Sequence, residues 1–406
     1  MCEPEDFHST NFLEVKTSNK DVAILNESTI QIGENTTVKV TSYHVGLCDL
    51  LFSVNKSNTT INMENNRIEV LLGKKSLNKA FVIILAILIL VNNTGFGCKL
   101  EAALLWKTLK KPLPPAIGFV CQFGLMAPLS FGITHLWNLD PLYGIGLLTI
   151  GAAPGGGGSN IFAILLDADL ELSITMSTIS TFAALGMTPL WLHVLGTRIL
   201  SRAKAHIPVK NVFISLATIT IPVIFGMLIT RFAPKVSKVA SKYLKIFMLF
   251  SGCIFFTVLV YTNWYLIPLV NFKIISSCLA LSASGYLLGG IIAWVCRQGR
   301  DKNITISIET GFQNVTMSLF LLNISLHHPE SDLASLIPIT YSLFGSVLPA
   351  LAYVIYATKN LIENYRKKSA ESDYQKVEAI GGSDSTVCSD IKDDDKRISD
   401  VELEKV

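Results

Sequence analysis

The stretch Gly151–Asn160 reads GAAPGGGGSN and lies in the middle of an apolar segment, Pro141–Leu166. Inside a helix, glycine costs about 1 kcal/mol relative to alanine and proline costs about 3 kcal/mol. A loop between two short helices is the plainer interpretation, but the flanks are too apolar and too short to be separate spans. A broken helix at membrane depth persists where its freed backbone is buried in protein or lines a cavity. The stretch therefore predicts a broken membrane helix.

A second interruption occurs in the later apolar segment Ile304–Leu326. Residues 309–314 read ETGFQN, which again places polar side chains and a glycine inside a span. Two interrupted hydrophobic segments at matching positions of two halves indicate the binding site of a secondary transporter.

The composition is that of a polytopic membrane protein. Of the 406 residues, 50% are hydrophobic and 16% are charged, whereas soluble domains carry about 25% charged residues. The net charge of +3 gives no indication of nucleic-acid binding. The eight cysteines are scattered without a CxxC or Cys/His cluster, so neither a disulfide framework nor a zinc site is indicated. No nucleophile–base pair or phosphate loop indicates an enzyme, and no cofactor is expected.

A bilayer helix needs about 20 mostly apolar residues. On this criterion we expect an all-α transporter domain over residues 79–358 with nine transmembrane helices. Pairing the segments as halves gives inverted five-helix repeats with the first helix missing and the two broken helices in matching positions. The nine segments are Ala80–Cys98, Pro115–Thr134, Pro141–Leu166, Leu170–Leu192, Val209–Ile229, Leu244–Tyr261, Ile274–Val295, Ile304–Leu326 and Leu336–Ala357.

Lysine and arginine in the loops orient the chain with the N-terminus outside and the C-terminus in the cytoplasm. The connection between the fourth and fifth spans disagrees with this orientation, because it places four basic residues outside. An amphipathic interfacial segment would explain them. The sequence leaves open whether the membrane is the plasma membrane or an internal one. The four residues are Arg198, Arg202, Lys204 and Lys210.

The two ends of the chain are polar. Residues 1–78 combine partial strand alternation with four Asn-x-Ser/Thr sequons, which predicts a small β-rich, glycosylated extracytoplasmic domain. Chance sequons are the alternative, and the lack of a signal peptide means either that the first span exports this region or that the start is incomplete. Residues 359–406 are expected to form a disordered, acidic cytoplasmic tail. The sequons are at Asn26, Asn35, Asn55 and Asn58.

Glu309 is the residue that the sequence singles out most sharply. An acidic side chain inside a span costs about 2.5–3.5 kcal/mol on insertion scales and is by default a functional-site hypothesis. A solvated position in an interfacial turn is the alternative. Na⁺ is a hard cation that selects oxygen ligands, and oxygens are abundant near both interruptions. They belong to Glu309, Ser159, Asn160 and Gln313, and to the freed carbonyls.

Hydroxyl groups also line one face of the span Leu170–Leu192. Ser173, Ser177 and Thr181 are four residues apart and share a helix face. These hydroxyls either face a polar site or bond back to carbonyls of their own helix, and the sequence leaves both open. The amide of Gln122, in the second span, is equally open to either interpretation.

Three motifs together resemble the bile acid:sodium symporter family over residues 80–358. They are Gln122-Phe followed by Met126-Ala-Pro, then Pro154-Gly-Gly followed by Ser159-Asn160, and last Glu309-x-Gly-x-Gln313-Asn314. The sequences around Gly95–Lys99 and Lys111–Pro114 are most similar to the orphan, P3-like branch, which carries an extracytoplasmic N-terminal domain. The resemblance implies two crossing broken helices in a core domain, beside a panel domain.

The resemblance also implies two sodium sites. The first corresponds to Ser159, Asn160, Ser173, Ser177 and Glu309. The second corresponds to Gln122, Glu309 and Gln313, with the carbonyls of Thr310 and Phe312. The four consecutive glycines depart from the family pattern, and no motif matches the substrate cavity.

The expected function is sodium-coupled symport of an amphipathic organic anion, such as a bile acid or a steroid conjugate, by alternating access. The expected partners are sodium ions, that anion and the lipid bilayer, with no nucleic acid. Asn160 and Asn314, at the two half-helix ends, are hypothesised to offer amides to the substrate. One alternative is a non-transporting receptor or assembly protein that keeps the fold. Another is a proton-coupled transporter using Glu309 alone, which would not need the Gln122 and Gln313 amides.

Overall fold

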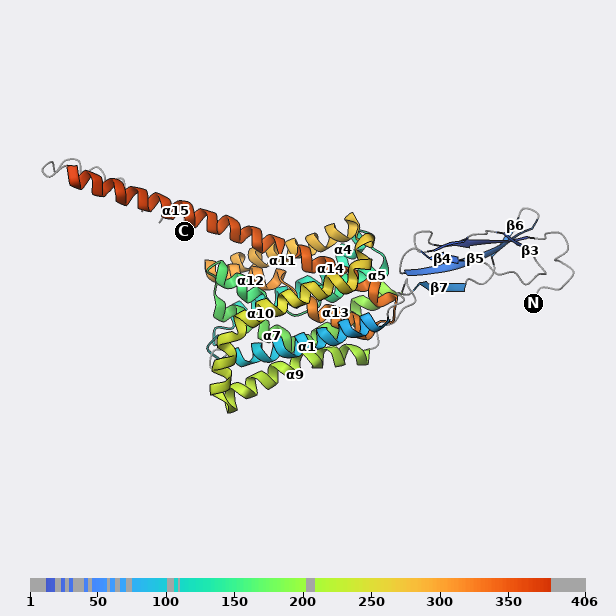
Figure 1. The fold of residues 1–406 in the computed structure, drawn as a ribbon, viewed down its shortest axis with the longest axis horizontal. Coiled ribbons are helices and arrows are strands. Elements are labelled where there is room, and N and C mark those ends of the chain that lie inside the picture. The colour runs from blue at the N-terminus through green and yellow to red at the C-terminus, as the bar shows by residue number, and fades with distance from the viewer. Residues whose placement is uncertain are drawn as a thin grey trace. The chain divides into compact units, whose positions relative to one another are not determined.

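The computed structural model is mostly helical (Figure 1). It describes residues 12–18, 23–25, 29–31, 40–42, 46–56, 59–62, 66–70, 75–100, 106–108, 110–201 and 209–380.

The first half of the helical part contains one continuous span, one bent span, one broken segment and a long helix that ends in a short turn. These elements are α1 (Lys75–Lys99), the run α3 (Leu113–Phe119), η2 (Val120–Leu125) and α4 (Met126–Leu136), the pair α5 (Pro141–Gly151) and α6 (Ser159–Leu165), and α7 (Leu170–Trp191), η3 (Leu192–Gly196) and α8 (Thr197–Leu200).

The second half of the helical part contains a second broken segment. Its elements are α9 (Val209–Phe232), α10 (Pro234–Asn263), η4 (Trp264–Leu269), α11 (Phe272–Val295), the broken pair α12 (Arg300–Gly311) and α13 (Val315–Ser325), α14 (Glu330–Phe344) and α15 (Val347–Ile380).

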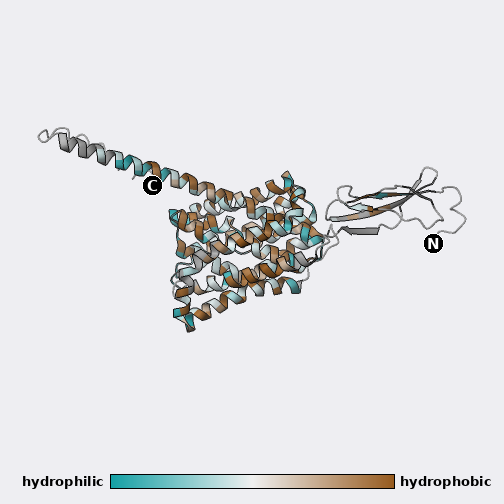
Figure 2. Cartoon of the chain, in the orientation of Figure 1, coloured by the Kyte–Doolittle hydropathy of each residue, from teal (hydrophilic) through white to brown (hydrophobic). Residues whose placement is uncertain are grey.

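Seven helical segments among the described residues are long and apolar enough to cross a membrane. They correspond to seven of the nine expected segments. The other two expected segments are the broken ones, whose apolar halves α5 and α13 have 11 residues each and are too short to span alone. Hydrophobic residues run along the helices throughout this part of the chain (Figure 2). The protein is therefore a polytopic membrane protein.

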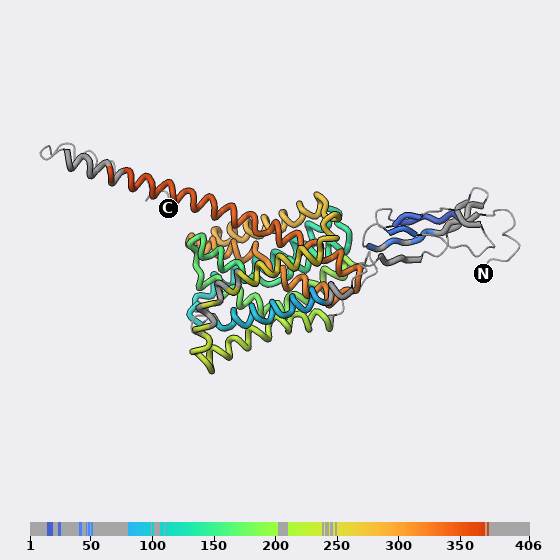
Figure 3. Tube along the Cα trace, in the orientation of Figure 1, coloured from blue at the N-terminus to red at the C-terminus, as the bar shows by residue number. Residues whose placement is uncertain are grey.

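The helix that precedes the bent span packs against helices of the second half. Helix α1 packs along α9 and α10, and in Figure 3 the tube of α1 runs beside that of α9. The two helices α1 and α9 approach closely at Gly97. A Cβ atom at this position would lie 2.2 Å from the carbonyl oxygen of Val223. The other helices gather around the two breaks, where α5 packs against α4 and α14, and α11 packs against α12.

The N-terminal region contains short strands. Strand β5 (Gly46–Lys56) pairs antiparallel with β1 (Phe12–Thr17), β6 (Thr59–Asn62) and β7 (Asn66–Val70), and β3 (Thr29–Gln31) extends the sheet beyond β1. Strands β2 (Ala23–Leu25) and β4 (Val40–Ser42) form a separate pair. Of the four sequon asparagines, Asn55 lies in β5, whereas Asn26, Asn35 and Asn58 lie outside the described residues.

The tail differs from the expectation. Residues 359–380, expected to be disordered, continue helix α15 to Ile380. This part of the tail is rich in lysine, glutamate and alanine, which are strong helix formers. Lys359 and Glu363 also form an i,i+4 ion pair at 3.6 Å, which favours a helix. Residues 381–406 lie outside the described part of the chain.

Candidate functional site

Two helix breaks form the centre of the site. The first covers residues 152–158, between α5 and α6, as the glycine-rich stretch predicted. The second is shorter than expected, because Glu309, Thr310 and Gly311 remain in α12 and only residues 312–314 leave the helix. The amide of Phe312 still donates to Ile308 O at 2.9 Å, and this bond completes the last turn.

The two breaks pair with each other through main-chain atoms. Gly155 and Gln313 form an isolated antiparallel bridge. Gly156 N donates to Phe312 O at 2.9 Å, and Asn314 N donates to Pro154 O at 3.1 Å. A Cβ atom on Gly156 would lie 2.8 Å from Gln313 O, so the close approach requires glycine at that position. The broken helices therefore cross by forming a minimal strand pair.

Side chains from other helices bind the carbonyls that the breaks release. Thr188 on α7 donates to Ala152 O at 2.6 Å. Tyr341 on α14 donates to Gly311 O at 2.7 Å. Because an unpaired buried carbonyl costs about 1–3 kcal/mol, these bonds stabilise the interrupted backbone. Neither residue was predicted from the sequence.

The carboxylate of Glu309 lies beside this crossing and is 2% exposed. Three serine hydroxyls reach it. Ser159 and Ser173 donate to Oε1 at 2.6 and 2.5 Å, and Ser177 donates to Oε2 at 2.8 Å. Among the residues that the structure describes, no lysine, arginine or histidine forms an ion pair with Glu309. Glu309 is therefore buried inside the helical part of the chain. The alternative interpretation, a solvated position in an interfacial turn, is wrong.

The cluster around Glu309 holds more acceptor oxygens than hydrogens. Ser159 Oγ lies 2.6 Å from Glu309 Oε1 and 2.7 Å from the carbonyl of Gly156. Ser173 Oγ lies 2.5 Å from the same carboxylate oxygen and 2.9 Å from Asn160 Oδ1. A hydroxyl has one hydrogen and two lone pairs, so each serine donates to one of its two acceptors at a time. This excess of oxygen lone pairs fits a hard cation such as Na⁺.

The five residues expected for the first sodium site are thus brought together by α6, α7 and α12. On the hydroxyl face of α7, two hydroxyl groups face the polar site and one bonds to a carbonyl of its own helix. Ser173 and Ser177 face the carboxylate, whereas Thr181 donates to the carbonyl of Ser177 at 2.7 Å, within its own helix. Ser180, seven residues after Ser173, was missed, although it accepts a bond from Gly155 N at 3.2 Å.

The residues expected for the second site also lie together. Gln122 Nε2 donates to Gln313 Oε1 at 2.7 Å and to Ala153 O at 2.8 Å. Gln313 Nε2 donates to Thr310 O at 2.8 Å. The carbonyl of Phe312 accepts from Gly156 in the crossing. The Gln122 amide is therefore part of this polar network and not an isolated buried group.

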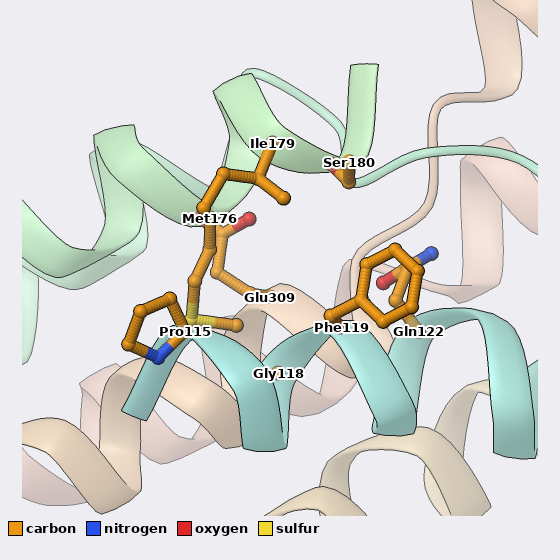
Figure 4. Close-up of a pocket in the computed structure, with 8 residues that line it drawn as sticks. All are labelled: Pro115, Gly118, Phe119, Gln122, Met176, Ile179, Ser180 and Glu309. Carbon is orange, nitrogen blue, oxygen red and sulfur yellow. The ribbon is translucent and has the colours of Figure 1, made fainter. Parts of the chain in front are cut away.

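A small pocket connects the two sets of residues. Figure 4 shows the side chain of Glu309 between α7, which carries Met176 and Ser180, and the run α3–η2, which carries Phe119 and Gln122. The cavity volume is about 10 Å³, which is about enough for one water molecule. The pocket thus has the size for one small ion next to the carboxylate.

Asn160 and Asn314 take part in the local structure at the two half-helix ends. Asn160 Nδ2 lies 3.3 Å from Gly157 O, and its Oδ1 accepts from Ser173. Asn314 Oδ1 accepts from Met317 N at 3.0 Å and caps α13. Both residues are partly exposed.

Comparison with known proteins identifies relatives of this chain. The profile of the Sodium Bile acid symporter family matches residues 86–263. The sodium-dependent organic anion transporter of Homo sapiens is 31% identical over 303 residues, which are 73% of this chain and 78% of that protein. The ileal sodium/bile acid cotransporter of Mus musculus is 30% identical over 305 residues, which are 74% of this chain and 85% of that protein.

The P3 protein of Mus musculus, from the branch that the motifs indicated, is also among the relatives. It is 31% identical over 277 residues, which are 68% of this chain and 58% of that protein. With a matching family profile and relatives covered over most of their length, this chain belongs to the Sodium Bile acid symporter family, a family of transporters and not of enzymes.

Proposed function

We propose that the protein is a sodium-coupled symporter of an amphipathic organic anion that works by alternating access. The observation that carries the proposal is the buried Glu309 carboxylate, which is surrounded by hydroxyl and carbonyl oxygens and has no basic partner among the described residues. Burying an ionised carboxylate is costly unless a counter-charge accompanies it. A bound cation supplies that charge.

Two sodium positions share Glu309 in this proposal. Ser159, Asn160, Ser173 and Ser177 hold the first ion with one carboxylate oxygen. Gln122, Gln313 and the carbonyls of Thr310 and Phe312 hold the second. The Gln122–Gln313 bond of 2.7 Å gives these amides a defined place, which supports the sodium-coupled proposal over a proton-coupled one.

The sodium ions would couple to substrate through the crossing. Ser159 belongs to α6, Ser173 and Ser177 to α7, and Glu309 to α12, so one ion ties three separate elements together. A site occupied by Na⁺ therefore fixes the ends of both broken helices. In this proposal Asn160 and Asn314 offer amide groups to the anion. Relatives named for organic anions and for bile acid support this class of substrate.

The topology that we propose has nine membrane segments, seven of them continuous and two broken, with the N-terminus outside and the C-terminus in the cytoplasm. The antiparallel pairing of the two breaks supports inverted repeats, because matching segments of such repeats run in opposite directions. The sequons of residues 1–78 support a glycosylated domain on the outside.

The test needs no substrate. The melting temperature of the purified protein would be measured in NaCl and in KCl at equal ionic strength, for wild type, Glu309→Gln and Glu330→Gln. A ligand that binds only the folded state stabilises it by about 2.7 kcal/mol at 100 times its dissociation constant. We expect a sodium-specific rise in wild type and in Glu330→Gln, and none in Glu309→Gln.

A folded wild-type protein with equal melting temperatures in both salts would contradict sodium binding and leave the proton-coupled and the non-transporting alternatives. Uptake of labelled organic anions into proteoliposomes, with and without a sodium gradient, then tests coupling. Sodium binding without sodium-dependent uptake of any anion would contradict symport.

A further inference from the structure

One feature of the sequence has no role in the proposed sodium sites. The connection between the fourth and fifth spans carries basic residues on the side that the other loops assign to the outside. Its first basic residue, Arg198, lies on the short helix α8 and is exposed. Residues 202–208 lie outside the described part of the chain. The surroundings of Arg198 indicate what this charge does.

Arg198 lies on the rim of a pocket formed where α4, α5 and α8 meet. The floor consists of Thr134, Leu139 and Ile199, which are 5%, 8% and 3% exposed. The three helices approach closely at Gly144 on α5, where a Cβ atom would lie 2.5 Å from Thr134 Cγ2 and 3.1 Å from Ile199 Cγ2. The floor of the pocket is therefore closely packed. We call this cavity the α4–α8 pocket; its lining is completed by His135, Asn138, Pro141 and Arg198.

The α4–α8 pocket is suited to an anion. None of its lining residues is acidic, and Arg198 forms no ion pair with any residue of the described chain. His135 Nδ1 lies 2.9 Å from Phe131 O and therefore donates to it, so Nε2 of the neutral ring is an acceptor and Arg198 remains the donor for an anion. Asp140, beside the pocket, is turned to its own helix, where Oδ1 accepts from Leu142 N at 2.9 Å.

The surface next to the pocket is apolar. Leu136, which follows His135, is 78% exposed, and Val194, one turn before Arg198, is 37% exposed. Leu190, a further turn along α7, is 48% exposed. A cationic pocket bordered by exposed aliphatic side chains matches a molecule with a charged head and hydrocarbon chains. The cavity volume is about 160 Å³, more than ten times that needed for one water molecule.

We infer that the α4–α8 pocket binds the phosphate of an anionic phospholipid, with Arg198 as its main ligand and the acyl chains lying along Leu136 and Val194. The guanidinium group suits phosphate because it donates two parallel hydrogen bonds to it. A lipid at this position would hold α8 against α4 and α5. It would also give the basic connection a counter-charge on the side where basic residues are otherwise scarce. The inference is independent of sodium coupling.

The experiment measures lipid binding without sodium. Purified protein in KCl would be titrated with dioctanoyl phosphatidylglycerol, with dioctanoyl phosphatidylcholine and with glycerol 3-phosphate, and the melting temperature recorded. The variants are Arg198→Gln, Arg198→Lys and, as a matched control, Lys273→Gln. Lys273 is an exposed basic residue at the start of α11, outside the pocket.

We expect phosphatidylglycerol to raise the melting temperature of wild type and Lys273→Gln more than phosphatidylcholine does. Arg198→Gln should weaken this binding about fivefold, since one basic residue near a membrane surface contributes about 1 kcal/mol, and Arg198→Lys should restore part of it. Equal lipid effects in wild type and Arg198→Gln would overturn the inference, as would a wild type that does not distinguish the two lipids. A rise with glycerol 3-phosphate as large as with phosphatidylglycerol would assign the pocket to a soluble anion instead.

Discussion

Substituting Gly155 by alanine should damage the proposed sodium site without altering any of its ligands. A Cβ atom at this position would lie 2.8 Å from Glu309 Oε2 and 3.6 Å from Ser180 Oγ. Ordinary contacts begin near 3.4 Å, so the carboxylate must withdraw by about half an ångström. Oε2 is also the oxygen that accepts from Ser177 at 2.8 Å. The added methyl group therefore displaces a carboxylate whose position is set by hydrogen bonds.

The expected cost follows from overpacking. An extra methyl group in a close-packed interior costs about 1–3 kcal/mol. If the sodium-bound state bears this cost, the dissociation constant for sodium rises about 5- to 150-fold. Sodium titrations of the melting temperature in a Na⁺/K⁺ mixture of constant ionic strength measure this shift directly.

Gly186→Ala is the matched control. It lies on α7, where a Cβ atom meets nothing within 4 Å. Alanine in place of glycine in a helix should stabilise the protein by about 0.5–1 kcal/mol and leave sodium affinity unchanged. The reasoning is refuted if Gly155→Ala binds sodium as tightly as Gly186→Ala does.

Three further substitutions and one control substitution test separate parts of the site. Ser177→Ala removes a hydroxyl that donates to the Glu309 carboxylate, so it should lower the free energy of unfolding by about 1–3 kcal/mol and weaken sodium binding. Thr181→Ala is the control, because it removes a hydroxyl that is bonded within its own helix. An equal loss of sodium affinity in Thr181→Ala would contradict the assignment of Ser177 to the site. Gln122→Leu should reduce the Hill coefficient for sodium in uptake assays from about two to about one, and a coefficient that stays near two would remove Gln122 and Gln313 from the second site. Thr188→Val keeps the shape but leaves a buried carbonyl unpaired, so chemical denaturation should show a loss of about 1–3 kcal/mol; unchanged stability would mean that the carbonyl finds another partner.

The sequence was informative where a residue type conflicts with its surroundings. Four glycines and a proline inside an apolar segment are costly in a helix, so the first break was predictable. A carboxylate inside a span is costly as well, and Glu309 was therefore found without a structure. The second break contains one glycine, and this weaker signal placed its start three residues too early.

Other features of the site could not be predicted because they depend on contacts far apart in the chain. Thr188 binds a carbonyl 36 residues away, and Tyr341 binds one 30 residues away. Nothing in their local sequence distinguishes them from hydroxyls that bond within a helix. Ser180 was predictable in principle, because it lies seven residues after Ser173 and thus on the same helix face. The helix over residues 359–380 was not predicted, because this polar segment has the composition of a disordered tail although its residues favour a helix.

The crossing of the two breaks has a consequence for mutagenesis. Its hydrogen bonds join main-chain atoms, so ordinary side-chain substitutions leave the donors and acceptors in place. Only proline removes a donor, at residue 156 or residue 314, because it lacks the backbone N–H. An alanine scan of both breaks would therefore detect steric crowding and the loss of side-chain ligands. It would not detect the contribution of the main-chain hydrogen bonds between the breaks. A proline at residue 314 would remove the hydrogen bond to Pro154 O, and it would also remove the Asn314 side chain that caps α13.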